Sequence, residues 1–184
     1  MKRFISLVVI LCLSTFAFTQ KKYFTKSGHI SFNAGTALED IDAVNTGATS
    51  IFDAGTGQIE YSVQIKGFEF KRALMQEHFN ENYLESDKYP KSVFKGRIQE
   101  PEKIKFDRDG SYPVLVKGIL EIHGIKKDVE TTGIMKVKGE MVNGRTEFKV
   151  ALADYNIDIP GLVRDKISKT VTISVNCNYN VLNK

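Results

Sequence analysis

Apolar and polar residues alternate without exception along the last part of the chain, over residues 171–181. A period of two is typical of a β-strand with one face against an apolar interior and the other in water. Residues 59–65 alternate in the same way. Phe68 and Phe70 continue that apolar series in the opposite phase, which predicts a bulge near Gly67.

Five further segments have the composition and the flanking turn residues of β-strands. These segments are 28–33, 92–99, 112–122, 127–137 and 146–153. Asp109-Gly110, His123-Gly124 and Asn143-Gly144 predict turns between them. We expect the domain to begin with its first strand at Gly28, and we interpret residues 37–57 as a loop.

One segment departs from the strand pattern. Between Lys71 and Leu84 the apolar positions approach helical spacing, and Pro90 closes the region. This predicts one short helix or a pair of helical turns. Many short strands with a single helical insertion predict an all-β fold, either an antiparallel barrel or a sandwich, and closure favours the barrel because it removes exposed strand edges.

The N-terminus has the layout of a secretory signal peptide. Lys2 and Arg3 precede a mostly apolar stretch, residues 4–18, that is shorter than the roughly 20 residues needed to span a bilayer. Small residues at Ala17 and Thr19 suit cleavage after Thr19. We therefore expect residues 1–19 to be a signal peptide and residues 20–184 to form one domain in the periplasm or outside the cell.

The charge balance and the cysteine content narrow the classes of function. The chain has 26 basic and 22 acidic residues, and loss of residues 1–19 would leave 24 basic against 22 acidic. So small an excess argues against nucleic acid as a partner. The mature chain would keep Cys177 as its single cysteine, which excludes an internal disulfide and, from its place in the alternating series, predicts a buried core thiol.

A barrel of about eight strands has an interior that either fills with side chains or holds one small ligand. The inward positions here are aliphatic and aromatic, so they predict either a dry cavity for an apolar guest or a filled core, and the pattern leaves both open. The candidate lining residues are Phe32, Tyr61, Val63, Phe68, Phe70, Met75, His78, Phe79, Phe94, Leu120, Ile122, Val150 and Ile173.

The sequence carries no motif for catalysis, for a cofactor or for a metal ion. His29, His78 and His123 are too far apart in the sequence to form a metal-binding pair. His78 either orients the polar head of a ligand or bonds to a neighbouring carboxylate. A lipid-modifying enzyme with His78 and Glu81 as an acid/base pair is a weaker alternative. An outer-membrane barrel is another, against which the absence of Trp and the charged helical segment both count.

Residues 82–90, Asn-Tyr-Leu-Glu-Ser-Asp-Lys-Tyr-Pro, followed by Phe-Lys-Gly at 94–96, resemble the central signature of the YceI-like family. Residues 116–125 are similar to that family's sequence of strand, tight turn and next strand, and residues 153–157 match it in order and spacing. The resemblance implies an exported, lipocalin-like antiparallel barrel whose relatives hold a polyisoprenoid chain or an isoprenoid quinone. The implied partner is therefore an isoprenoid or another amphiphilic lipid, with at most peripheral membrane contact. A homodimer is compatible with this fold.

Overall fold

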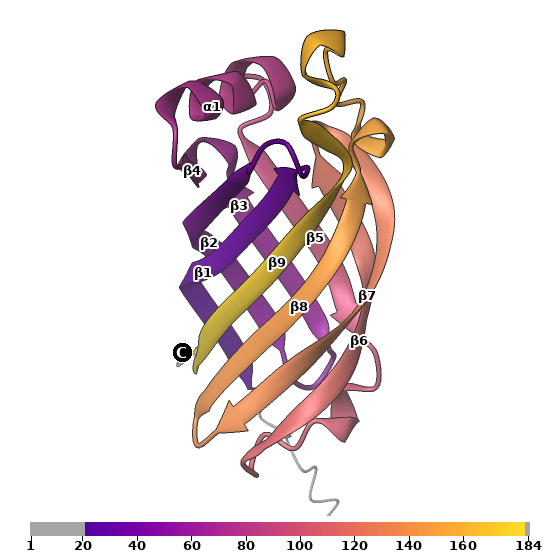
Figure 1. The fold of residues 1–184 in the computed structure, drawn as a ribbon. Helices are drawn as coiled ribbons and strands as arrows, with labels where there is room; N and C mark the ends of the chain where they lie inside the picture. The colour runs from indigo at the N-terminus through magenta and orange to yellow at the C-terminus, as the bar shows by residue number, and fades with distance from the viewer. Residues whose placement is uncertain (1–20, 183–184) are drawn as a thin grey trace, which may run out of the picture.

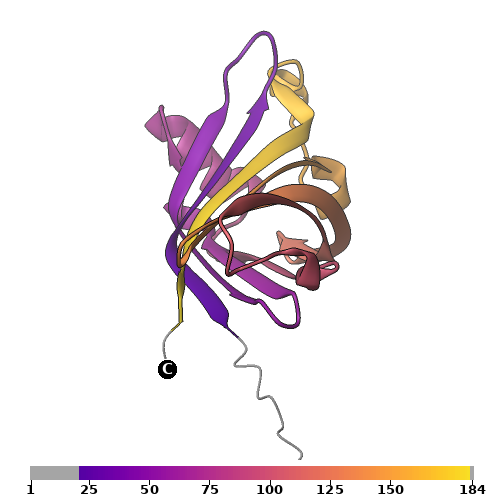
Figure 2. The same cartoon turned by 90° about the horizontal axis from the view of Figure 1, so that it is seen from below.

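The computed structural model describes residues 21–182, so the predicted signal peptide lies outside the described residues. Eight antiparallel strands form a closed barrel in which β1 pairs with both β9 and β2 (Figure 1). Around the barrel the strands are β1 (Lys22–Gly35), β9 (Ile167–Val181), β8 (Met141–Ala151), β7 (Ile125–Lys138), β6 (Gly110–Ile122), β5 (Lys91–Ile98), β3 (Gln58–Gln64) and β2 (Asp42–Asp53). The strands curve around a common axis in the view from below (Figure 2). The predicted all-β antiparallel barrel is confirmed.

Short helical segments and one very short strand complete the fold. The two-residue strand β4 (Glu69–Phe70) pairs with the start of β2, at Ala43 and Val44. The helical segments are η1 (Ile65–Gly67), α1 (Ala73–His78), η2 (Phe79–Tyr83), η3 (Pro101–Lys103), η4 (Leu152–Tyr155) and η5 (Gly161–Val163). The predicted helical insertion is confirmed as α1 followed by the π-helical turn η2, at the upper end of the barrel in Figure 1.

Two expectations about the first part of the barrel are wrong. Residues 37–57 are not a loop, because β2 occupies most of them and pairs with β1 on one side and β3 on the other. Its inward side chains include Ala43, Asn45 and Ser50, whose small or polar character hides the strand from a search for apolar alternation. In addition, β1 begins six residues before Gly28, so that Tyr23 is already part of the core.

Only some of the turns lie where the sequence predicts them. His123 and Gly124 form the predicted two-residue turn between β6 and β7, with φ of 52° and 73°, the geometry that suits a tight hairpin. The turn expected at Asn143-Gly144 is wrong, since both residues lie within β8 and the chain turns earlier, at Gly139 with φ of 57°. The 3-10 turn η1 stands where a bulge was expected near Gly67.

Buried side chains fill the barrel interior at the end where β1 begins and β9 ends, and we call this the filled end. Phe52 is 1% exposed there, with its ring stacked on Tyr23 at 4.9 Å between centroids and edge-on to Tyr179 at 5.4 Å. Cys177 is fully buried in the same cluster, as its place in the alternating series predicts. The buried members of the filled end are Tyr23, Phe52, Ile59, Ile98, Ile104, Val114, Met135, Val137, Val142, Cys177 and Tyr179.

Candidate functional site

A cavity of about 440 Å³ occupies the barrel between the filled end and the opposite end, which we call the open end. Its size falls within the range typical of small-molecule sites. All thirteen candidate residues from the sequence line this cavity; that they contact a ligand stays a prediction. They come from β1, β3, β5, β6, β8 and β9, from the segment that contains β4, and from α1 and η2.

The floor of the cavity consists of side chains that also pack against the filled end, among them Tyr61, Phe94 and Val116. The Phe94 ring lies against Gly96 and Gly118, which face each other across β5 and β6. A Cβ atom placed on either glycine would lie only 2.5 or 2.7 Å from Phe94 Cζ. The glycine pair therefore lets the ring lie close to the barrel wall and leaves the space above it free.

Three hydroxyl groups form a buried chain beneath the floor. Ser50 Oγ donates to the Glu60 carbonyl at 2.8 Å and lies 2.9 Å from the Tyr179 hydroxyl, which donates to Tyr61 Oη at 2.7 Å. Burial raises the pKa of the Tyr61 and Tyr179 phenols well above their ordinary value, so both stay neutral. Tyr61 is the member of this chain that lines the cavity, so its hydroxyl can take part in a hydrogen bond with a polar atom near the floor.

Four phenylalanine rings hold the helical insertion against the barrel. Phe79 of η2 lies 5.4 Å from Phe32 of β1 and 5.0 Å from Phe70 of β4, and Phe68 contacts both Phe32 and Phe79 at under 6 Å between centroids. Such stacked, tilted and edge-on pairs add about 0.5–1.5 kcal/mol each beyond simple burial. This cluster fixes α1 at the open end, where Met75 and the exposed His78 form part of the rim.

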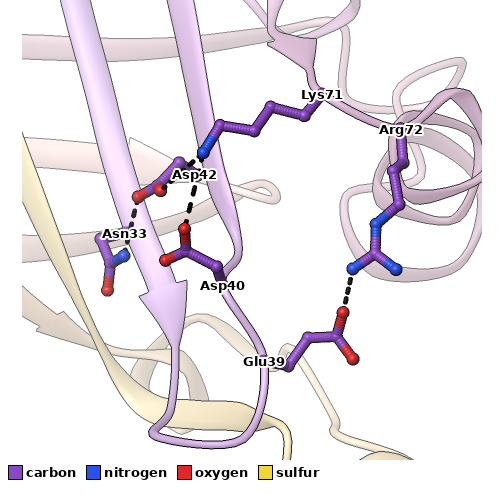
Figure 3. Close-up of polar contacts among 6 residues, drawn as sticks. All are labelled: Asn33, Glu39, Asp40, Asp42, Lys71 and Arg72. Atoms are coloured by element: carbon purple, nitrogen blue, oxygen red, sulfur yellow. Dashed lines mark hydrogen bonds and ion pairs between the residues drawn. The ribbon is translucent and has the colours of Figure 1, made fainter.

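Charged side chains tie together three segments at the open end. Glu39, in the connection between β1 and β2, accepts a hydrogen bond from Arg72 just before α1 and pairs with Lys166 just before β9, at 3.5 Å (Figure 3 shows the Arg72 contact). Next to the Glu39–Arg72 contact, Lys71 Nζ lies 3.5 Å from Asp40 Oδ2 and 4.0 Å from Asp42 Oδ2. The Arg72 hydrogen bond lowers the pKa of the Glu39 carboxyl, with smaller contributions from the charges of Arg72 and Lys166.

We predict that this rim contact weakens in acid. Because the folded protein lowers the Glu39 pKa, the carboxylate stabilises the rim at pH values above its unfolded pKa, and this contribution is lost as the pH falls through the lowered folded pKa. Glu39→Gln should therefore speed amide hydrogen exchange in residues 36–42 and 72–78 at neutral pH and have no effect in strong acid. Glu69→Gln, in neighbouring β4, controls for the loss of one negative charge. Equal exchange in wild type and Glu39→Gln at neutral pH would contradict the prediction.

His123 connects the β6–β7 turn to two other segments at the open end. Its Nδ1 lies 3.1 Å from the Tyr155 carbonyl oxygen of η4, and its Nε2 lies 2.7 Å from Glu85 Oε2. The Tyr89 ring packs edge-on against the imidazole at 4.7 Å between centroids. These contacts give His123 a positioning role in the scaffold, beyond the turn role that the sequence predicts.

The described residues hold no group of three or more His, Cys, Asp or Glu side chains that could bind a metal ion. Among the helices of residues 21–182, none is both long enough and apolar enough to cross a membrane. The polar side chains that line the cavity include Tyr61 at the floor, Thr131 and Thr146 in the wall, and the charged Glu39, Arg72 and Lys166 at the rim.

The comparisons with known proteins agree with this architecture. Residues 14–179 match the sequence profile of the YceI-like domain. The chain belongs to the YceI-like family. Among curated protein sequences, none matches this YceI-like chain significantly.

Solved structures share the fold of this YceI-like protein at low sequence identity. A polyisoprenoid binding domain from Saccharophagus degradans, implicated in plant cell wall breakdown, superposes with a TM-score of 0.76 at 11% identity, covering 89% of this chain and 99% of that one. BcnA of Burkholderia cenocepacia gives 0.69 at 12% identity, over 83% and 95% of the two chains. The YceI protein of Campylobacter jejuni gives 0.58 at 13% identity, over 75% and 81%.

Several lining residues of this YceI-like barrel were missed from the sequence. Phe148 and Val175 lie two residues from a predicted lining position on their own strands, and Val116 lies four residues before Leu120, so the same alternation would have identified them. Nothing in the sequence signals the rim, because its charged residues lie far apart along the chain and are indistinguishable from other surface charges.

Proposed function

We propose that this YceI-like protein is a binding protein that holds an isoprenoid or a similar amphiphilic lipid in its barrel and acts by binding, without catalysis. The observation that carries the proposal is the cavity of about 440 Å³, whose walls are almost entirely aliphatic and aromatic. Such a space is poorly suited to water and favours an apolar guest, since each buried methylene contributes about 0.8 kcal/mol. The polyisoprenoid binding domain of Saccharophagus degradans, which shares this fold, supports the choice of ligand class.

Polar groups near the cavity favour an amphiphile over a plain hydrocarbon. The Tyr61 hydroxyl near the floor can form a hydrogen bond, and Arg72 and Lys166 present positive charge at the rim. An apolar pocket with few polar groups typically uses those groups to orient the ligand. Together with the signal-peptide pattern of residues 1–19, these features support a carrier or store of lipid or quinone in the periplasm or outside the cell.

The test is to express the full chain with residues 1–19 and to purify the exported protein for native mass spectrometry and organic extraction. We expect a mass that corresponds to cleavage after Thr19 and a co-purifying isoprenoid or quinone. The same spectrum distinguishes a monomer from a homodimer. A protein that carries no lipid, and that also fails to take up farnesol, solanesol or a menaquinone when these are added, would overturn the proposed function.

A further inference from the structure

The barrel wall is split along one seam, between β7 and β8. The ladder between these two strands runs from the Lys138–Met141 pair to the Gly133–Thr146 pair and ends there. Both strands nevertheless continue towards the open end, over residues 125–132 of β7 and 147–151 of β8. We call these two facing stretches the split; β7 and β8 run side by side in Figure 1.

The neighbouring seams are intact, which confines the divergence to the split. β6 and β7 remain paired up to Ile122 and Ile125, at the His123-Gly124 turn. β8 and β9 remain paired up to Ala151 and Thr170. The two edges of the split therefore stay parts of regular sheet, and their facing main-chain N–H and C=O groups lie beyond the end of the shared ladder, where they can bond to water or to a ligand.

A hollow of about 430 Å³ lies at the split. Val129, Thr131 and Phe148 line this hollow and also line the main cavity, so they mark its inner side. Thr132 and Glu147 line it as well, although they belong to the outward-facing set of their strands. Because neighbouring side chains of a strand point to opposite faces, the hollow is lined by residues of both faces of the wall, some towards the cavity and some towards solvent.

Threonine hydroxyl groups hold the lower end of the split. Thr131 Oγ1 and Thr146 Oγ1 lie 2.9 Å apart, and Thr146 Oγ1 donates to the Thr132 carbonyl at 2.8 Å. Close approach at this point requires Gly133, since a Cβ there would lie 2.6 Å from the Arg145 carbonyl oxygen. At the upper end, η4 contacts β7, β8 and β9. The split is thus bounded at both ends. On its inner side Val129 and Phe148 lie beside the Thr131 hydroxyl, and Thr132, Glu147 and Lys149 place hydroxyl, carboxylate and ammonium groups towards the outside.

We propose that the split is the subsite for the polar end of the amphiphile, held at the Thr131 and Thr146 hydroxyls while the apolar chain lies in the cavity. The proposal rests on the proposed function and specifies which part of the ligand binds where. The inner side of the split, formed by Val129 and Phe148, contacts the first part of the chain. The outer side of the split carries Thr132 and Lys149 and is open to water. An end group with an oxygen atom, such as an alcohol or a carbonyl, therefore stays hydrated there.

The first experiment compares farnesol with the hydrocarbon of the same skeleton, farnesane. Wild type should bind the alcohol more tightly, and replacing both Thr131 and Thr146 by valine should reduce that preference about threefold to tenfold while leaving farnesane binding unchanged. Tyr61→Phe is the matched control, because it removes the hydroxyl at the floor and leaves the split intact. Loss of the preference in Tyr61→Phe, with no loss in the valine variant, would overturn the proposal.

A second experiment locates the polar end directly and does not depend on the stability of the valine variant. N-farnesyl maleimide carries a thiol-reactive group at its polar end, and Cys177 gives little background because it is fully buried and burial raises its pKa to about 11. Thr132→Cys places a thiol at the outer side of the split, and Leu162→Cys places one in η5 at the open end, at a position that is 99% exposed.

We expect the Thr132→Cys protein to be labelled faster than the Leu162→Cys protein, and excess farnesol to block the reaction. Faster labelling at position 162 that farnesol also blocks would place the polar end at the open end and overturn the proposal. If neither variant is labelled although both bind farnesol, the polar end of the ligand lies inside the barrel, and the proposal is also overturned. A wild-type protein that binds neither farnesol nor solanesol would instead refute the proposed function itself.

Discussion

Val116→Phe is expected to abolish lipid uptake while the barrel stays folded. Val116 is an inward residue of β6 that lies on the cavity floor and keeps part of its surface free inside the barrel. A phenyl ring at this position can extend into the cavity, so it takes ligand space without displacing packed neighbours. A change of one methylene in an apolar pocket alters ligand affinity about tenfold or more. The larger phenyl ring should weaken affinity at least as much. Titration with farnesol and solanesol measures the loss, and circular dichroism reports the fold.

The matched control is Ile119→Phe, which adds similar bulk to the outer face of the same strand, where Ile119 is 47% exposed. This variant should bind lipid as wild type does. Val63, another lining residue, is less suitable because it is only 7% exposed and packs within a buried cluster that contains Phe68. Enlarging Val63 would therefore test core packing as well as cavity space. Undiminished binding by a folded Val116→Phe protein would show that the ligand lies elsewhere.

Phe52→Ala is expected to cause the largest loss of stability, about 3–5 kcal/mol in the free energy of unfolding. The Phe52 ring is almost completely buried and contacts the rings of Tyr23, Phe106 and Tyr179. Its removal leaves a void that the surrounding strands cannot close, because they are joined by ladders on both sides. Chemical denaturation measures this loss. We expect a lower midpoint and an unchanged slope of the unfolding free energy against denaturant concentration.

The comparison variant is Phe148→Ala, which makes the same truncation at the cavity wall. Phe148 is only partly buried, since it faces both the cavity and the split. Less of its surface is removed from solvent on folding, so its truncation should cost clearly less than that of Phe52. Equal losses would mean that the cavity region is packed as tightly as the filled end. We expect the two losses of stability to differ because Phe52 lies in the filled end, whereas Phe148 lies at the wall of the cavity.

The alternating pattern was sufficient to predict the fold class and much of the cavity wall. Successive side chains of a strand point to opposite faces, so every second residue shares a face. The local sequence therefore places Leu120 and Ile122 on one face of β6 and Lys117 and Ile119 on the other. The same logic placed the candidate residues of the strands around one space, whereas Met75, His78 and Phe79 reach it from the helical insertion. The His123-Gly124 turn was also predictable, because few residue pairs adopt two successive positive φ angles.

The second strand shows where local pattern fails. Residues 42–53 carry small and polar side chains at positions such as Ala43, Asn45 and Ser50, so their apolar signal is weak. Tertiary contacts compensate for this weakness: Ser50 bonds to Tyr179, and Asn45 donates to the Gln64 carbonyl at 3.0 Å. The strand forms because its neighbours on both sides supply partners, a contribution that sequence pattern does not reveal.

For the strands with a clear apolar alternation, the amino-acid sequence was enough to predict which residues face inward, because this depends only on the two-residue period of a strand. Only the tertiary structure decided that the interior is filled at one end and hollow at the other, since this depends on how side chains from all strands share one volume. It also decided that Glu39, Arg72 and Lys166 meet at the rim, and that β7 and β8 separate beyond Gly133. Both features arise from the relative placement of segments distant in sequence, which local periodicity does not encode.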